Sequence, residues 1–134
     1  MEIKINNAIF KKHKVKLAYL FGSRAKGNAA PESDFDIAVL FEKPPRDTLA
    51  LRETMDISSD LARIYSPMKF DIVSLHCAPL LLKYEVAAHN RLLYCGDEKE
   101  RVSFEVSAIK EYIDEEPIRK LYNNALYKRI LQGA

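Results

Sequence analysis

Short apolar runs separated by polar segments dominate the first two thirds of the chain, and they predict β-strands. The run at 15–21 (VKLAYLF) is rich in β-branched and aromatic residues and stops at Gly22, which is typical of a strand that ends in a turn. The segments 34–41 (DFDIAVLF) and 69–75 (KFDIVSL) have the same character, and a shorter strand is expected at 92–94. These runs predict a small mixed sheet.

Segments with apolar residues at helical spacing separate these strands. Short helices are expected at 6–13 and 80–88. A longer helix is expected to begin after Pro44-Pro45, with Asp47 as its N-cap, and to reach Tyr65. We expect one face of that helix to pack on the sheet through Leu51, Met55, Leu61, Ala62 and Tyr65.

The last third of the chain predicts two consecutive helices. The first covers about 98–113, and Pro117 starts the second, because proline is tolerated in a first helical turn and not in a helix interior. Apolar stripes are expected on both helices, formed by Val102, Val106, Ile109, Tyr112 and Ile113 on the first and by Ile118, Leu121, Tyr122 and Ala125 on the second. The predicted fold class is therefore α/β (α+β), a small mixed sheet flanked by helices. We expect a single domain over 1–134, with its core at about 15–95 and a helical C-terminal arm at about 97–132.

Composition and charge describe an ordinary globular protein. Of the 134 residues, 48% are hydrophobic and 30% are charged, and the net charge is only +2. A dedicated nucleic-acid-binding protein usually has a strong basic stripe, so a nucleic-acid partner is not expected. The one basic cluster, at 11–16, is short and is interpreted as a solvated helix face.

The chain has no sequence features of secretion or membrane insertion. The first residues are polar and charged, and no apolar run approaches the length of a membrane span. Cys77 and Cys95 form no CxxC motif, so they are interpreted as reduced thiols. A cytoplasmic protein without membrane association is expected.

The segment 22–40 carries the most informative chemistry. Gly22-Ser23 directly follows a predicted strand and leads into an expected short helix, where a ligand can approach the glycine backbone and free N–H groups attract phosphate. Ser23 adds a hydroxyl donor, and Arg24 adds positive charge beside it.

Asp34 and Asp36 lie two positions apart on a predicted strand, so their side chains leave the same face with Cα atoms roughly 6–7 Å apart. Two carboxylates on one face suit a hard cation such as Mg²⁺, with water and phosphate oxygens completing its octahedron. A bare DxD more often caps a turn and adds an edge-strand charge. The strand, the GS turn and the small-residue loop at 27–33 favour the metal interpretation here.

Asp71 is the third candidate acid. It stands within the otherwise apolar segment 69–75, where a buried charge would be costly without a partner. A neighbouring metal site would remove that cost. An ion pair with a lysine or arginine on a helix is the alternative.

These motifs carry a family resemblance. The segment 22–37 resembles the GSxxxG…SDxD signature of the DNA polymerase β-like nucleotidyltransferase superfamily, through Gly22, Ser23, Gly27, Ser33, Asp34 and Asp36. In size the chain is similar to the minimal nucleotidyltransferases, the MNT or MntA-type antitoxins encoded beside HEPN-domain toxins. The resemblance covers about 15–95 and implies the palm-like nucleotidyltransferase fold.

The resemblance also implies a mechanism. Gly22 and Ser23 would hold the β- and γ-phosphates of ATP, and Asp34 and Asp36 would bind Mg²⁺. Asp71 would join a second metal ion and help to deprotonate the acceptor hydroxyl. Two Mg²⁺ ions and ATP as substrate are therefore expected.

Three functions remain open at this level. The first is an antitoxin that transfers AMP to a tyrosine hydroxyl of a cognate HEPN ribonuclease toxin, in a possible hetero-oligomer with it. The second is a non-catalytic antitoxin that neutralises the toxin by binding alone. The third is nucleotidyl transfer to a small molecule such as an aminoglycoside. Because three acids are retained, an enzyme is favoured over a pure binder.

Overall fold

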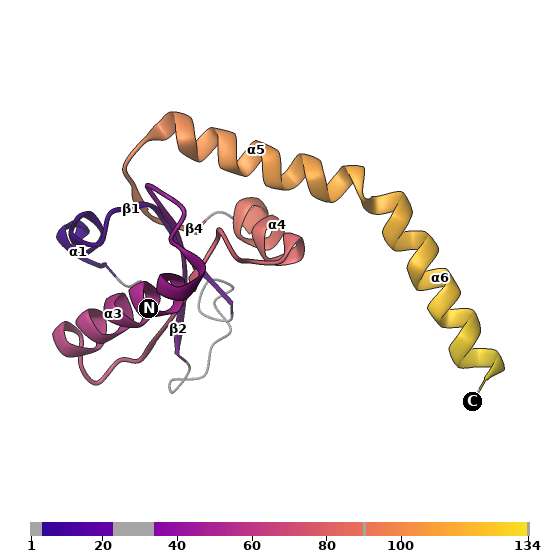
Figure 1. Ribbon diagram of the computed structural model, residues 1–134, viewed down its shortest axis with the longest axis horizontal. Helices are drawn as coiled ribbons and strands as arrows, with labels where there is room; N and C mark the ends of the chain where they lie inside the picture. Colours follow the sequence, from indigo (N-terminus) through magenta and orange to yellow (C-terminus); the bar gives the residue numbers. More distant parts are fainter. Residues whose placement is uncertain (1–3, 23–33, 90, 134) are drawn as a thin grey trace.

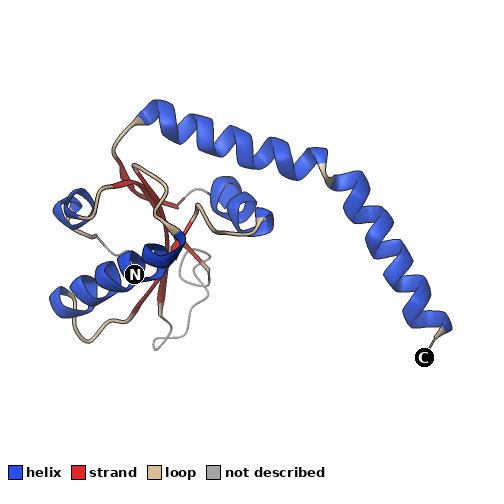
Figure 2. Cartoon of the chain, viewed as in Figure 1, coloured by secondary structure: helices blue, strands red, loops and turns tan. Residues whose placement is uncertain are grey.

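The computed structural model describes residues 4–22, 34–89 and 91–133, and its centre is a four-stranded sheet in the order β3-β2-β1-β4 (Figures 1 and 2). The strands are β1 (Val15–Phe21), β2 (Phe35–Phe41), β3 (Phe70–Ser74) and β4 (Arg91–Cys95). β1 pairs antiparallel with β2 and β4, whereas β2 and β3 are parallel. The predicted mixed sheet is confirmed, with all four strands within a residue or two of their expected bounds.

Side chains alternate between the two faces of this sheet, as the period of a strand requires. On β2, Phe35, Ile37 and Val39 belong to the hydrophobic cluster on one face, and Ala38 belongs to the cluster on the other. Asp36, between Phe35 and Ile37, therefore lies on the same face as Ala38. That alternation decides which face carries the acidic residues.

Helices α1 (Asn7–Lys12) and α3 (Asp47–Ile64) cover the first face. Phe10 of α1 is fully buried and stacks on Tyr94 of β4, with ring centroids 5.5 Å apart. The Asn6 side chain caps α1 by accepting from Ala8 N at 2.9 Å. α3 begins at Asp47 with Arg46 at the N-cap, so the prediction of Asp47 as the N-cap is wrong by one residue.

The packed face of α3 differs from the predicted one. Leu51 and Met55 are 70% and 59% exposed, and Ala62 is also exposed. Leu61 is buried and Tyr65 packs against the core cluster, so only these two of the five expected residues face the sheet.

Two residues with hydroxyl side chains lie on the side of α3 that packs on the sheet, which the pattern of apolar residues did not predict. Thr54 is buried beside Ile57, and its Oγ1 donates to Leu51 O at 2.9 Å. Ser58 Oγ donates to Phe70 O at 2.7 Å. Because each hydroxyl finds a backbone acceptor, burying it costs little, and polar residues can take part in the packed face.

Helices α4 (Leu80–His89) and α5 (Glu98–Asp114) lie on the second face, where Val86 and Phe104 join the cluster around Leu17 and Tyr19. The hydroxyl of the buried Tyr19 donates to Glu105 of α5 at 2.8 Å, and Arg101 pairs with the same carboxylate at 3.0 Å. Burial and the Glu105 carboxylate raise the pKa of the Tyr19 hydroxyl. This hydrogen bond attaches α5 to the central strand.

The last two helices form the expected C-terminal arm. α5 ends at Asp114 and α6 (Glu116–Gln132) follows at an angle, projecting away from the sheet (Figure 1). Pro117 stands in the first turn of α6, as predicted. The apolar residues expected on the two helices are mostly uncovered by the described chain, since Val102, Val106, Ile113, Ile118, Leu121 and Tyr122 are 51–71% exposed. Within the described ranges, no helix combines the length and apolarity that crossing a bilayer requires.

A cluster of ion pairs joins the end of α1 to α3, and we expect this contact to be sensitive to acid. Asp60 Oδ2 lies 2.7 Å from His13 Nε2 and 3.1 Å from Lys12 Nζ. Hydrogen bonds from His13 and then Lys12 lower the pKa of Asp60 from 3.8 to about 2. Because the folded state has the lower pKa, this contribution to stability is complete above pH 3.8 and is lost as the pH falls through about 2.

We therefore expect the free energy of unfolding to fall more steeply in the wild type than in Asp60→Asn as the pH decreases through that window. Urea unfolding at several pH values measures this difference. Asp56→Asn, on the same helix and exposed, is the matched control and should follow the wild type. Parallel pH profiles for the wild type and Asp60→Asn would contradict the assignment.

Candidate active site

The acids of the candidate site meet at the N-terminal ends of the parallel strands. Asp36 of β2 and Asp71 of β3 are direct Cα partners in the ladder, so their backbones are about 4.8 Å apart and their side chains leave the same face. Asp34 precedes β2 by one residue, and its charge acts on Asp36. The two strands therefore bring Asp36 and Asp71 together, and Asp34 stands just before β2, where its charge acts on Asp36.

The electrostatics of Asp36 report this proximity. Three causes raise the pKa of Asp36: burial is the largest, the charge of Asp71 is the second and the charge of Asp34 is the third. Carboxylates that repel one another through a partly dry region must be close in space. A cation placed among them would turn this repulsion into attraction.

The three acids differ in how far their side chains are exposed to solvent. Asp34 and Asp71 are exposed and Asp36 is half-buried. The expectation of a buried charge at Asp71 is therefore wrong: β3 is the edge strand of the sheet, and the side chain of Asp71 reaches solvent. Among the described lysines and arginines, none forms an ion pair with Asp71, which leaves the alternative of a helix partner without support there.

Gly22 closes the site from the neighbouring strand. It directly follows β1, whose last residue, Phe21, is the ladder partner of Asp36. Its φ of +76° lies in the left-handed region, and a Cβ on Gly22 would collide with the Asp36 carboxylate. The position therefore needs glycine on two grounds, conformation and space. The sequence signal for this contact was a glycine immediately after a strand, although the identity of its neighbour was not predictable.

Two predicted nucleotide-binding residues, Ser23 and Arg24, lie outside the described residues. Their assignment stays a prediction from the sequence. Gly22 is therefore the only one of the three proposed nucleotide contacts whose surroundings are described.

The donor set fits a hard divalent cation. Within the described ranges, no three His, Cys, Asp or Glu side chains are gathered as a ready-made metal cage. The three aspartates instead offer oxygen donors on one open face, and Mg²⁺ typically binds one or two carboxylates together with waters and substrate phosphates. Exposed carboxylates beside a glycine that lets a ligand approach the backbone suit a metal ion that binds together with its nucleotide.

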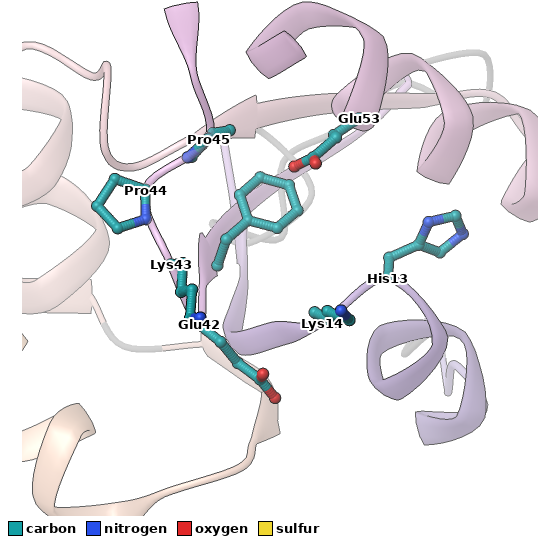
Figure 3. A pocket seen from close by; sticks show the side chains of 8 residues that line it. His13, Lys14, Glu42, Lys43, Pro44, Pro45 and Glu53 are labelled. Carbon is teal, nitrogen blue, oxygen red and sulfur yellow. The ribbon is translucent and has the colours of Figure 1, made fainter.

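A separate cavity of about 310 Å³ lies at the other end of β2, where Phe41 is followed by Pro44 and Pro45 (Figure 3). Its charged residues have both signs, with Glu42 and Glu53 among the acids and Lys43 among the bases. None of the predicted site residues lines it. This cavity is therefore not the candidate active site.

Comparisons with known proteins agree with the fold and the motifs. Residues 4–99 match the family described as "Polymerase beta, Nucleotidyltransferase". That match spans most of the chain and includes the β1–β2 segment and all three acids. The chain belongs to this nucleotidyltransferase family.

Within this family, the chain is similar to several individual proteins. The chain is 38% identical over 93 residues to the protein adenylyltransferase MntA of Aphanizomenon flos-aquae (strain 2012/KM1/D3), and the match covers 63% of this chain and 61% of that protein. It is also similar to a toxin–antitoxin structure with AMP-PNP, with a TM-score of 0.72 and 25% identity over 92% of this chain and 99% of that one.

A third similarity is to a structure described as a tri-AMPylated HEPN toxin of Shewanella oneidensis in complex with its MNT antitoxin. Its TM-score is 0.67 at 23% identity, and it covers 90% of this chain and 91% of the other. At that identity the likeness concerns the fold. Because the structural matches extend over at least nine tenths of the chain, the fold similarity includes much of the C-terminal arm.

Proposed function

We propose that the chain is an Mg²⁺-dependent nucleotidyltransferase that transfers AMP from ATP to a tyrosine hydroxyl of a cognate HEPN toxin and so acts as its antitoxin. The observation that carries this proposal is the register of β2 and β3, which sets Asp36 beside Asp71 with Gly22 against the Asp36 carboxylate. Asp36, Asp71 and Gly22 thus lie next to one another. That point is where the family resemblance requires the nucleotide.

In this proposal the turn after β1 holds the triphosphate. Gly22 lets phosphate approach the backbone without a side chain in the way, and Ser23 donates a hydroxyl. Arg24 adds positive charge beside the phosphates. The similarity to a toxin–antitoxin structure that contains AMP-PNP supports an adenine nucleotide as the ligand.

Asp34, Asp36 and Asp71 would hold the metal. When bound, two Mg²⁺ ions would stabilise charge on the attacking and leaving oxygens at the α-phosphorus. The chain's own part would be to hold the carboxylates near one another: the parallel ladder sets Asp36 beside Asp71, and Asp34 stands just before β2.

In this proposal Asp71 accepts the proton of the acceptor. Its side chain is exposed at the edge of the sheet, so a hydroxyl on another protein can reach it. The tyrosine oxygen would lose its proton to the Asp71 carboxylate as it bonds to the α-phosphorus. The bond from the α-phosphorus to the bridging oxygen breaks, and pyrophosphate leaves.

A protein acceptor fits the open character of the site. Asp34 and Asp71 are both exposed, so a hydroxyl carried by another protein has access to them. A protein substrate brings its own positioning surface. The names of the relatives, a protein adenylyltransferase and an MNT antitoxin with an AMPylated HEPN toxin, support the same acceptor class.

The proposal is tested by incubating the purified chain with ATP, Mg²⁺ and the HEPN-type protein encoded beside its gene. We expect the partner to gain the mass of one or more AMP units, mapped to tyrosine by peptide mass spectrometry, and to lose ribonuclease activity. EDTA should abolish the modification. Tight complex formation and full neutralisation without any mass gain would instead support an antitoxin that acts by binding alone.

A further inference from the structure

Three planar groups are stacked at the elbow where α5 meets α6. Tyr84 of α4 and Tyr112 of α5 stack with ring centroids 3.9 Å apart at an interplanar angle of 15°. The guanidinium carbon of Arg119, from α6, lies 3.6 Å above the Tyr112 ring. Arg119 thus connects α6 to α5 through a cation–π contact, and the Tyr84–Tyr112 stack connects α5 to α4.

The stack leaves part of that arginine without a hydrogen bond. Arg119 Nη1 is buried, and no acceptor for it exists among the described residues. A buried charged N–H group without an acceptor is costly. Arg119 as a whole is half-buried and lines a cavity, so an anionic acceptor from outside the chain would approach the guanidinium from that side.

A cavity of about 360 Å³ lies at this elbow and has the right charge. Arg119 and Lys120 line it on the positive side, Glu116 on the negative side, and Asn123 adds an amide. Lys120 and Glu116 pair with each other at 3.3 Å. The charge of Arg119 is therefore the one left over for a ligand.

Apolar side chains beside the cavity show what kind of molecule would bring the anion. Ile113, which is 57% exposed, lines the cavity together with the rings of Tyr84 and Tyr112. Ile118, Leu121 and Tyr122 are 67–71% exposed elsewhere on α6. α6 contains no buried residue. A cationic pocket bordered by uncovered aliphatic and aromatic groups matches the composition of a protein interface, where arginine and tyrosine anchors are enriched.

We propose that the elbow is a docking site for a protein partner that inserts an aspartate or glutamate side chain onto the Arg119 guanidinium, with apolar residues on either side of it. The stack holds the guanidinium flat and preorganised, so that it can bind a carboxylate with little loss of side-chain entropy. The inference uses the proposed function only to name the partner as the HEPN-type toxin. The chemistry of the elbow requires an acidic side chain between apolar ones, whichever protein carries it.

The main test compares charge-removing variants on the same helix. Calorimetric titration of the full chain with the neighbouring HEPN-type protein should show that Arg119→Gln weakens binding by at least about tenfold. Arg119→Lys keeps the charge and loses the planar fork, so its loss should be intermediate. Arg129→Gln, which removes an equal charge from an exposed position of α6, is the matched control and should change affinity less than about threefold.

Circular dichroism of each variant verifies that the arm keeps its helix content. Equal affinities for Arg119→Gln and Arg129→Gln at unchanged helix content would overturn the proposal.

A second measurement keeps the elbow testable if the partner is misidentified. The Arg119 guanidinium resonances are followed by ¹⁵N NMR during titration with acetyl-Leu-Glu-Leu-amide and with its glutamine counterpart. We expect shifts with the glutamate peptide alone, even though the affinity of so short a peptide is low. Absence of a complex between the wild-type chain and its neighbour would contradict the proposed function. Absence of any Arg119 shift with the glutamate peptide would contradict the elbow site.

Discussion

Replacing Asp34 and Asp36 together by asparagine is expected to reduce Mg²⁺-dependent AMP transfer by roughly a thousandfold or more. Two of the three carboxylates that share the site lose their charge, while the β2 backbone and the Asp71 position stay as they are. Metal-ion catalysis contributes several kcal/mol of transition-state stabilisation, and each factor of ten in rate corresponds to about 1.4 kcal/mol. The rate of AMP incorporation into the partner, at saturating ATP, measures the loss.

Stability separates this catalytic role from a structural one. Because burial and the charges of Asp71 and Asp34 raise the pKa of Asp36, the ionised acids repel one another in the folded chain. Removing two of these charges should leave the melting temperature unchanged or raise it. Asp56→Asn, an exposed acid on α3, controls for charge and should keep full activity. Retention of AMP transfer in the double variant would exclude these acids as the metal site.

The sequence predicts the relation between site residues that are close together in the chain better than the relation between residues that are far apart. The period of a strand predicts that Asp34 and Asp36 share one face, and the structure confirms the strand from Phe35 to Phe41, with Asp34 just before it. The position of Asp71 needed more than local pattern, because nothing in the sequence states that β3 lies parallel to β2 with Asp71 opposite Asp36. That register belongs to the tertiary fold. The family resemblance gave Asp71 a role but not its ladder partner.

The helix faces show the limit of hydrophobicity as a guide. On α3 the apolar residues Leu51 and Met55 face solvent, whereas Thr54 is buried with its hydroxyl bonded to the backbone. A pattern of apolar residues cannot report a polar side chain whose hydrogen bond is satisfied within its own helix. The sequence predicts apolar stripes on α5 and α6, and most of their side chains are exposed in the structure. The pattern of apolar residues does not tell whether the same chain or another protein covers such a stripe.

Gly22→Ala is expected to damage both stability and nucleotide binding. A left-handed conformation costs a non-glycine residue about 1–2 kcal/mol, and Gly22 has φ +76°. The new Cβ also collides with the Asp36 carboxylate, and overpacking of this kind costs about 1–3 kcal/mol. We therefore expect the free energy of unfolding to fall by about 2–5 kcal/mol. ATP affinity should fall at least about tenfold, because the Asp36 carboxylate and the turn at Gly22 can no longer occupy their places together.

A double-mutant cycle with Asp36→Ala separates the two causes. In that background the carboxylate is absent, so Gly22→Ala should cost only the conformational part, about 1–2 kcal/mol. Gly96→Ala is the matched control: its Cβ would lie 3.1 Å from the Tyr94 hydroxyl and no positive φ is involved, so a smaller destabilisation and unchanged ATP binding are expected. Urea unfolding and ATP titration of the four chains of the cycle measure both quantities. If Gly22→Ala costs the same with and without the Asp36 carboxylate, the close contact between turn and acid does not shape the site, and the phosphate-binding role of Gly22 must rest on its backbone conformation alone.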